Sequence, residues 1–306
     1  MKKMFATFTI ILIAILIIIY YLSDKEKNVL DAEERVKLGG SYISLSDGIT
    51  HYKLSGPIDG QLVVFIHGGI VPMWIWDNQV EALNKAGYKV LIYDQHGRGY
   101  SDRPKAVYNQ ELYKRQLIEL VDKLGIDNQF NLVGLSLGGG TAVNFSAQYP
   151  NRIRKLVLIS PLINNYKVPS IFKVPIIGEF VARLFGSKII SHQRFASLFE
   201  GNPDANKYKM LFEVQTTYKG FQRSLLSMLR NDAVGDYTIS YEILGKQERQ
   251  ILLIWGTKDK EITQEMIAEI KGLLPNLRFE QINDVGHGIV FQKPEVINSF
   301  LLDFIR

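Results

Sequence analysis

At 306 residues the chain is long enough for one large α/β domain with an inserted segment and a sizeable buried core. The net charge of +5 comes from scattered basic residues. Without a basic stripe and interleaved aromatic residues, nucleic-acid binding is not expected, whereas a mild attraction to anionic membranes is compatible with this charge. The absence of cysteine excludes disulfides, thiolate metal sites, a cysteine nucleophile and a lipid anchor on cysteine.

An apolar segment near the N-terminus predicts a membrane helix. Residues 4–22 carry no charge and nearly supply the ~20 apolar residues that a helix needs to cross a bilayer. Their length, and the lack of a small-x-small cleavage site after them, favour a retained signal anchor over a cleaved signal peptide; the alternative is secretion after cleavage. Lys2 and Lys3 predict a cytoplasmic N-terminus and an extracytoplasmic domain, with Tyr20 and Tyr21 in an interfacial aromatic belt.

The chain that follows is expected to alternate between strands and helices. Residues 41–45 and 50–54 flank Ser46-Asp47-Gly48 and predict a hairpin. Further strands are predicted at 62–66, 88–93, 130–133 and 155–160, and helices at 74–86, 110–124 and 141–148. Fully apolar strands separated by helices are typical of a mostly parallel, doubly wound sheet with helices on both faces.

The alternation stops over residues 161–249 and then resumes. This segment has helix-like stretches at 178–185, 207–218 and 221–231, and we interpret it as a helical lid inserted over the carboxyl edge of the sheet. Strands at 250–255 and 277–282 and helices at 263–274 and 294–305 complete the pattern. The predicted organisation is an anchor and stalk at 1–27, two parts of the core at 28–160 and 250–306, and the lid at 161–249, with charged residues 23–39 interpreted as a stalk or linker.

A serine stands at the turn between the strand at 130–133 and the helix that follows it. The sequence there is Gly134-Leu135-Ser136-Leu137-Gly138, and glycine on both sides keeps side chains out of a close backbone approach. A sharp strand–turn–helix holds a serine hydroxyl clear of the backbone, near the N–H groups that begin the helix. In this context the motif resembles the nucleophile elbow of the α/β-hydrolase superfamily.

Two later loops supply an acid and a base. Asp259 and His287 each follow a predicted strand. A serine hydroxyl needs a base to take its proton, and the base needs a group that orients it. The order Ser136, Asp259, His287 resembles the chain order of the triad in the same superfamily. Glu261 is the rival acid, which the Gly256-x-x-Asp259 pattern disfavours.

The resemblance extends over residues 42–306 and implies an oxyanion hole. An apolar strand ends in His67-Gly68-Gly69, which resembles the oxyanion loop of the family. The resemblance implies that the backbone N–H groups of Gly69 and Leu137 stabilise the oxyanion and that His67 braces the turn. The loop at 94–104, with Asp94, Arg98 and Asp102, resembles a structural loop of the family.

The resemblance also implies an activity. We expect a membrane-anchored serine hydrolase that cleaves carboxylic esters with short or medium acyl groups, or monoacylglycerol-like esters, through an acyl-enzyme and with no cofactor or metal. Ile70-Val71-Pro72 after the glycines disfavours an aminopeptidase, and Ser136 in place of aspartate disfavours haloalkane dehalogenases and epoxide hydrolases. Carbon–carbon bond, lactone or amide hydrolysis on the same triad stays open, as does a non-catalytic, membrane-tethered binding protein.

Five further residues are expected to be structural. His51, His96 and His192 are expected at the surface or in loops. Trp74 and Trp76 are expected to pack the first core helix, with lining of the acyl pocket as the alternative.

The apolar stretch at 168–185 has two interpretations. It contains Lys173 and Arg183 among apolar residues. The favoured interpretation is that it covers the pocket. The alternative, prompted by the apolar N-terminal segment, is that it faces a bilayer and admits lipid-like substrates.

Overall fold

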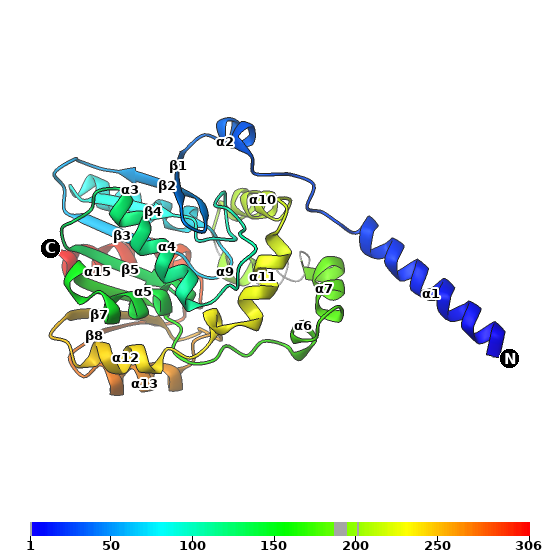
Figure 1. Ribbon diagram of the computed structural model, residues 1–306. Helices are drawn as coiled ribbons and strands as arrows, with labels where there is room; N and C mark the ends of the chain where they lie inside the picture. Colours follow the sequence, from blue (N-terminus) through cyan, green and yellow to red (C-terminus); the bar gives the residue numbers. More distant parts are fainter. Residues whose placement is uncertain (1, 187–194, 201) are drawn as a thin grey trace.

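A computed structural model describes residues 2–186, 195–200 and 202–306, and these residues contain one eight-stranded sheet (Figure 1). Its order is β1-β2-β4-β3-β5-β6-β7-β8. β2 runs antiparallel to β1 and β4, and the pairs from β4 to β8 are parallel, as expected for a mostly parallel sheet. The strands are β1 (Ser41–Leu45), β2 (Gly48–Ser55), β3 (Leu62–Ile66), β4 (Lys89–Tyr93), β5 (Phe130–Leu135), β6 (Ile153–Ile159), β7 (Gln250–Gly256) and β8 (Arg278–Ile282).

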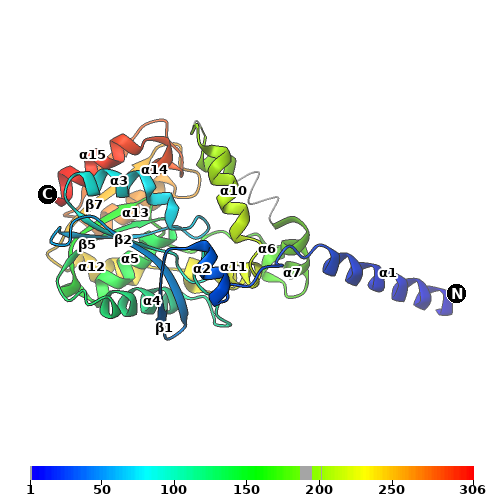
Figure 2. The ribbon, with the colours of Figure 1, turned by 90° about the horizontal axis from the view of Figure 1, so that it is seen from above.

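The central strands are apolar along most of their length because helices cover both faces of the sheet. Every residue of β5 is buried, as are the last four of β3 and β4. Figure 2 shows α3 and α15 on one face and α4, α5 and α12 on the other. The helices of these layers and their neighbours are η1 (Met73–Trp76), α3 (Asp77–Lys85), α4 (Gln110–Lys123), α5 (Leu137–Gln148), η2 (Pro150–Arg152), α12 (Thr238–Gly245), α13 (Gln264–Leu273), α14 (Ile289–Gln292) and α15 (Pro294–Ile305).

The chain between β6 and β7 forms a group of helices on the side from which the N-terminal helix projects (Figure 1). They are α6 (Ser170–Lys173), α7 (Ile177–Val181), η3 (Ala182–Gly186), α9 (Phe195–Leu198), α10 (Ala205–Gln215), α11 (Phe221–Arg230) and η5 (Asp232–Val234). The three predicted helices of this segment correspond to α7 with η3, to α10 and to α11. We call α6 to α11 the inserted helices. α12, from the same stretch of sequence, packs against α5 and so belongs to the layer on the sheet.

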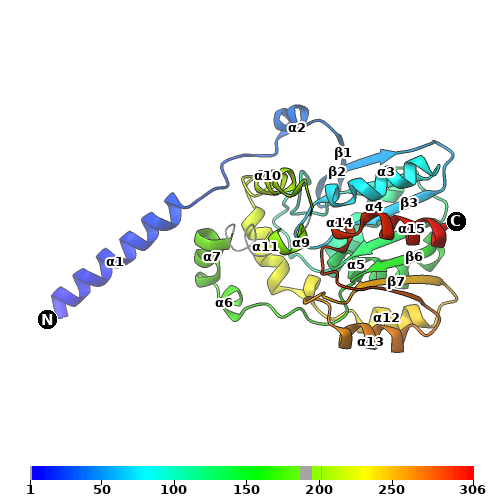
Figure 3. The ribbon, with the colours of Figure 1, turned by 180° about the vertical axis from the view of Figure 1, so that it is seen from behind.

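The N-terminal helix α1 (Lys2–Leu22) projects away from the domain and has no buried residue (Figure 3). Among the described residues, it alone has the length and apolar composition to cross a membrane. The same properties are found in signal sequences near an N-terminus.

The segment after α1 is packed against the domain, which differs from the linker that its charged composition predicts. The Asp31 side chain caps the short helix α2 (Ala32–Leu38) by accepting a hydrogen bond from the Glu34 N–H at 2.9 Å. Arg35 is buried and donates to the Asp102 carboxylate at 2.5 Å. Glu26 is also buried. Charged side chains therefore attach this segment to the domain. Arg35 bonds to Asp102, and Glu26 accepts backbone N–H groups near residue 220.

Candidate active site

Ser136 occupies the turn between β5 and α5. Its φ of 55° lies in the left-handed region, which is unusual for a residue with a side chain. A Cβ on Gly134 would lie 2.3 Å from the Gly138 carbonyl oxygen, and a Cβ on Gly138 would lie 2.4 Å from the Ile66 carbonyl oxygen. The two glycines are thus required by the close approach of backbone to backbone that makes the turn possible.

Asp259 and His287 come together from the loops after β7 and β8. The Nδ1 atom of His287 lies 2.7 Å from Oδ2 of Asp259. Oδ1 of Asp259 accepts backbone N–H groups from Glu261 at 2.9 Å and from Ile262 at 3.0 Å. Burial alone would raise the pKa of Asp259, but the charge and hydrogen bond of His287, together with these two N–H groups, hold it below the usual 3.8. The ionised carboxylate can only accept, so Nδ1 donates to it and Nε2 is left to accept a proton.

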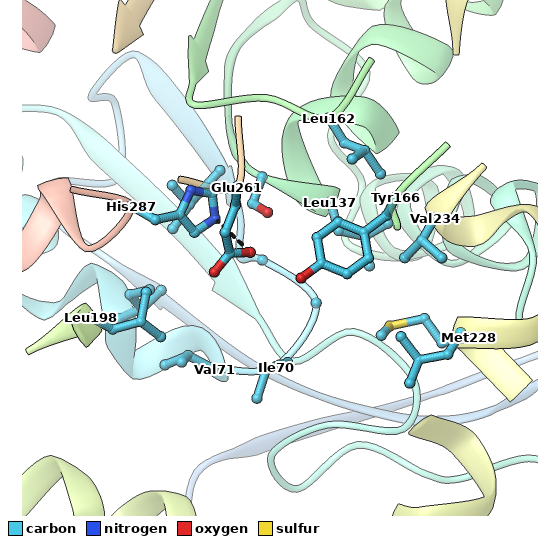
Figure 4. A pocket seen from close by; sticks show the side chains of 16 residues that line it. Ile70, Val71, Leu137, Leu162, Tyr166, Leu198, Met228, Val234, Glu261 and His287 are labelled. Carbon is cyan, nitrogen blue, oxygen red and sulfur yellow. Dashed lines mark ion pairs between the residues drawn. The ribbon is translucent and has the colours of Figure 1, made fainter. Parts of the chain in front are cut away.

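Ser136 and His287 line the same cavity at the carboxyl edge of the sheet. Gly69 and Leu137 line it as well. Figure 4 shows His287 beside Glu261, with the Tyr166 hydroxyl pointing into the cavity. Most of the remaining wall is apolar and includes Ile70, Val71, Leu162, Leu198, Met228 and Val234. The geometry therefore brings Ser136, His287 and both predicted oxyanion donors to one largely apolar cavity. Asp259 does not line the cavity and contacts it through His287.

The rival carboxylate, Glu261, lies on the opposite side of the imidazole from Asp259. Its Oε2 atom is 3.8 Å from Nε2 of His287 (Figure 4). Asp259 is thus hydrogen-bonded to Nδ1, whereas Glu261 lies on the side of Nε2 and lines the cavity. Among the described residues that line the cavity, Glu261 is the one carboxylate and there is no lysine or arginine.

The loop after β3 lies directly against the serine. A Cβ on Gly68 would lie 3.5 Å from the Ser136 Cβ, which is ordinary contact distance. Leu137 is the first residue of α5, so its N–H has no carbonyl one turn earlier to bond. The buried Arg98 donates from Nε to the Gly69 carbonyl at 2.5 Å and holds this loop from behind. The backbone of the two candidate oxyanion donors is therefore positioned independently of any substrate.

His67 fixes the same loop from within the core. Its Nε2 accepts the Gln95 N–H at 2.9 Å, and its Nδ1 lies 2.6 Å from the Gly68 carbonyl oxygen, to which it donates. Complete burial lowers the pKa of His67 to about 4, despite the opposing effects of Asp94 and the Gly68 carbonyl. The neutral form is the one that fits, because a protonated Nε2 could not accept from Gln95.

His51 and His96 are both buried. The prediction of a surface or loop position is wrong for His51, which lies on a strand, and correct for His96, which lies in the loop after β4. His51 lies on β2, and its Nδ1 is 2.7 Å from Oδ2 of Asp94. The pairing of β2 with β4 places it beside Asp94, the residue that follows β4. His96 belongs to the polar loop, which is folded inward. The third predicted histidine, His192, lies outside the described residues.

The two tryptophans predicted to pack the first core helix are held by aromatic neighbours. Trp76 is fully buried, with its ring 4.8 Å from that of Phe65. The Trp74 ring stacks on Tyr208 of α10 at 5.2 Å. Trp74 therefore joins the first core helix to the inserted helices.

The sequence pattern of the alpha/beta hydrolase fold matches residues 61–294. The chain belongs to the α/β-hydrolase fold family. It is 30% identical over 289 residues to the 2-hydroxy-6-oxononadienedioate/2-hydroxy-6-oxononatrienedioate hydrolase of Paraburkholderia phymatum, covering 86% of this chain and 94% of that one. It is 24% identical over 266 residues to the carboxylesterase YbfK of Bacillus subtilis, covering 86% of each. The solved enol-lactonase of Burkholderia xenovorans LB400 superposes with a TM-score of 0.73 at 22% identity, covering 87% of this chain and 99% of that one.

These similarities support an α/β hydrolase and do not select one reaction. The relatives are named for an oxo-dienedioate, for carboxylic esters and for an enol lactone. The choice between such substrates depends on the side chains that line the cavity. Tyr166, Met228 and Glu261 line the cavity, and no sequence motif marks them as lining residues.

Proposed function

We propose that this α/β hydrolase cleaves neutral carboxylic esters, with Ser136 as nucleophile, His287 as general base and Asp259 as the acid that orients it. Oγ of Ser136 attacks the ester carbonyl carbon while Nε2 of His287 takes the hydroxyl proton. The tetrahedral intermediate then expels the alkoxide, which receives that proton, and leaves an acyl group on Ser136. Water then gives a proton to Nε2 as it attacks the acyl carbon. The second tetrahedral intermediate breaks its bond to Oγ of Ser136, which recovers the proton from Nε2, and the carboxylic acid is released.

The backbone N–H groups of Gly69 and Leu137 are the proposed donors to the oxyanion of both tetrahedral intermediates. Both residues line the cavity beside Ser136. Removing one such donor typically lowers turnover by about 10²–10³. His67 and Arg98 have positioning roles in this scheme. The bond from His67 to the Gly68 carbonyl holds the peptide unit that carries the Gly69 N–H, and the bond from Arg98 to the Gly69 carbonyl holds the next peptide unit.

The hydrogen bond between Asp259 and His287 is the observation that carries the proposal. A buried carboxylate at 2.7 Å holds Nδ1, while Nε2 belongs to a cavity that Ser136 also lines. A binding protein would have no need for a histidine oriented in this way beside a serine in a strained turn. The non-catalytic alternative is therefore disfavoured.

The charge of the cavity favours neutral esters over anionic substrates. The name dienedioate denotes two carboxylates, and a lysine or arginine would be needed to hold them. Among the described residues that line the cavity, the charged side chain is that of Glu261, which is an acid. Two like charges ~5 Å apart repel by on the order of 3 kcal/mol at an effective dielectric constant of ~20. An apolar wall with one carboxylate suits a neutral ester with a short or medium acyl group.

The test is hydrolysis of p-nitrophenyl esters from acetate to palmitate by the full chain in detergent. The wild-type chain should show an optimum of acyl length. Ser136→Ala and His287→Ala should each lower kcat by at least about 10⁴, and Asp259→Asn by about 10³–10⁴. The exposed Ser44 gives a matched control, because Ser44→Ala should keep full activity. Activity that survives in Ser136→Ala would sink the assignment.

Labelling by a fluorophosphonate separates the alternatives. Labelling of Ser136 without turnover of any ester would point to carbon–carbon, lactone or amide hydrolysis on the same triad. Neither labelling nor turnover would favour the binding protein. Both outcomes contradict ester hydrolysis, and they do so for different reasons.

A substitution of Glu261 tests whether its charge selects the substrate. Glu261→Gln should raise kcat/KM for an anionic hemisuccinate ester relative to the neutral butyrate ester by on the order of 10²-fold, equivalent to ~2.8 kcal/mol. The change should appear mainly in KM, because the repulsion acts on binding. An unchanged ratio would show that Glu261 does not select substrate charge.

A further inference from the structure

The end of α1 packs against the inserted helices. The ring of Tyr20 stacks on that of Phe180 in α7 at 6.1 Å. The Arg183 guanidinium lies 4.1 Å from the centre of the Tyr20 ring and 3.5 Å from the Asp24 carboxylate. These contacts place α7 and η3 beside the last turn of the helix that has the length and composition of a membrane span.

A second set of contacts joins residues 23–31, which we call the juxtamembrane segment, to the same helices. Both carboxylate oxygens of Glu26 accept backbone N–H groups at the start of α11, from Gly220 at 2.7 Å and from Gln222 at 2.5 Å. The Asn28 side chain donates to the Thr217 hydroxyl at 2.8 Å. The orientation of α1 relative to the inserted helices is thus set by specific bonds on two elements.

The surface of the inserted helices next to α1 exposes large apolar side chains. Ile176 is 82% exposed and Ile177 51% exposed, at the start of α7. Val174 and Phe185 are exposed by 44% and 52%. We call these four residues the membrane-facing surface. Figures 1 and 3 show α7, which carries part of it, on the side of the domain toward α1.

The position of Tyr20 sets the depth of this surface. Tyr20 is two residues from the end of α1 at Leu22, or about 3 Å along a helix that rises 1.5 Å per residue. If α1 spans a bilayer, Tyr20 lies at the boundary between acyl chains and headgroups, where tyrosine is enriched. Phe180, stacked on Tyr20, lies at the same level, and so does the helix that carries it.

We propose that the membrane-facing surface enters the headgroup region of the bilayer that α1 crosses. Apolar side chains beside cations are the composition of surfaces that lie in this region. The exposed Lys173 supplies a cation that suits anionic headgroups, whereas Arg183 is paired with Asp24. The one acidic side chain of α7, Glu179, is ion-paired with Arg230. The bilayer is favoured over a protein partner because α7 and η3, which carry Ile177 and Phe185, contact the last turn of α1 through Phe180 and Arg183.

The same surface is connected to the cavity. Arg230, at the end of α11, donates from Nε to the Phe172 carbonyl of α6 at 2.7 Å. Met228 and Leu229, which precede Arg230, line the cavity. An ester dissolved in the bilayer would therefore meet a wall of the cavity that is attached to the membrane-facing surface. This inference concerns the location of the domain and would stand if Ser136 were inert.

The absence of cysteine allows a direct test of depth with single labels. Full-length Ile176→Cys is labelled with a fluorophore and reconstituted in phosphatidylcholine–phosphatidylglycerol vesicles. Ile58→Cys is the matched control, because Ile58 is 91% exposed and precedes β3, at the opposite end of the sheet from the cavity. Ile11→Cys, within α1, reports whether the helix itself inserts.

At position 176 we expect strong quenching by nitroxide-labelled lipids and iodide quenching about threefold or more below that at position 58, as for a group in the headgroup region. Equal iodide quenching at 176 and 58, with position 11 shielded, would overturn the proposal while leaving the membrane helix in place. Iodide access at all three positions would overturn both. Equal unfolding midpoints of the labelled chains exclude misfolding as the cause.

Discussion

The sheet edge at Ser136 and the contact between the juxtamembrane segment and the inserted helices are built differently. At the sheet edge, backbone atoms approach so closely that Gly134 and Gly138 cannot carry side chains. At the juxtamembrane contact, partly buried side chains meet through rings and an ion pair, as Arg183 does with Tyr20 and Asp24. The first arrangement allows little adjustment, because every atom has a near neighbour. The second can break and re-form at small cost.

This difference suits the two proposed functions, which are catalysis at the sheet edge and contact with a bilayer at the inserted helices. Oxyanion donors act best when they are already aimed before the reaction begins, which a rigid backbone provides. A surface that meets a bilayer has to admit substrate, and helices held by side-chain contacts at the edge of the domain open more readily than a sheet core does. Substitutions at the sheet edge should therefore have large effects on stability, and those at the juxtamembrane contact should have small and local ones.

Gly134→Ala should have the largest effect on folding. The added Cβ would lie 2.3 Å from the Gly138 carbonyl oxygen, and neither backbone segment can move without opening the turn at Ser136. We expect a loss of at least about 4 kcal/mol in the free energy of unfolding, measured by chemical denaturation, or a chain that does not fold. Gly272→Ala in α13 is the matched control, since a Cβ there meets nothing within 4 Å. It should be neutral or stabilise by about 0.5–1 kcal/mol. Equal stability of the two variants would show that the turn is adaptable.

The sheet and the turn at Ser136 were predictable because each is specified by residues close in sequence. The strands β1, β3 and β8 have the predicted bounds to within one residue, and each is a short apolar or alternating run. Helix α2 was missed because it has only seven residues and is stabilised by the bond from Arg35 to the distant Asp102. Local patterns do not report such partners.

The side chains around the candidate site were predicted in part. Ser136, Asp259 and His287 could be named because each follows a strand in a recognisable order. The orientation of Glu261 could not be predicted, since it depends on the turn that forms when Asp259 accepts the Glu261 and Ile262 N–H groups. The same limitation applies to His51, whose partner Asp94 is adjacent only after β2 pairs with β4.

Acid should weaken the sheet edge through His67 and His96. Burial lowers the pKa of each to about 4, from an ordinary 6.5. Below pH 6.5 the unfolded chain binds protons that the native chain does not bind until about pH 4, so stability falls as the pH falls. Between pH 7.5 and 5.5 each histidine should remove about 1 kcal/mol from the free energy of unfolding.

The measurement is urea denaturation across this pH range. His96→Gln should reduce the pH dependence by about one proton of uptake, because one buried group no longer titrates. Stability that stays constant over this range in the wild-type chain would contradict the neutral, buried state of both histidines. The matched comparison is His287→Gln. This substitution removes a histidine that lines the cavity, so the pH dependence caused by His67 and His96 should remain.

Glu26→Gln should have the smallest effect, confined to the juxtamembrane contact. The substitution keeps the size of the side chain and removes the negative charge from the N-terminus of α11, where such a charge contributes about 0.3–1 kcal/mol. It also replaces one of the two accepting oxygens with an amide NH2 group, which cannot accept, so one of the two backbone N–H groups loses its partner. Hydrogen exchange of the first amides of α11 should accelerate by about fivefold or more, while exchange in α5 and the midpoint of global unfolding stay unchanged. Glu33→Gln on the exposed face of α2 controls for the loss of one carboxylate, because Glu33 is paired only with the exposed Lys37 among the described residues. Faster exchange in α5 as well would show that the two regions unfold together and that the contrast between them is wrong. A chain that begins after Glu26 would lack this bond, so truncation experiments should retain residues 23–31.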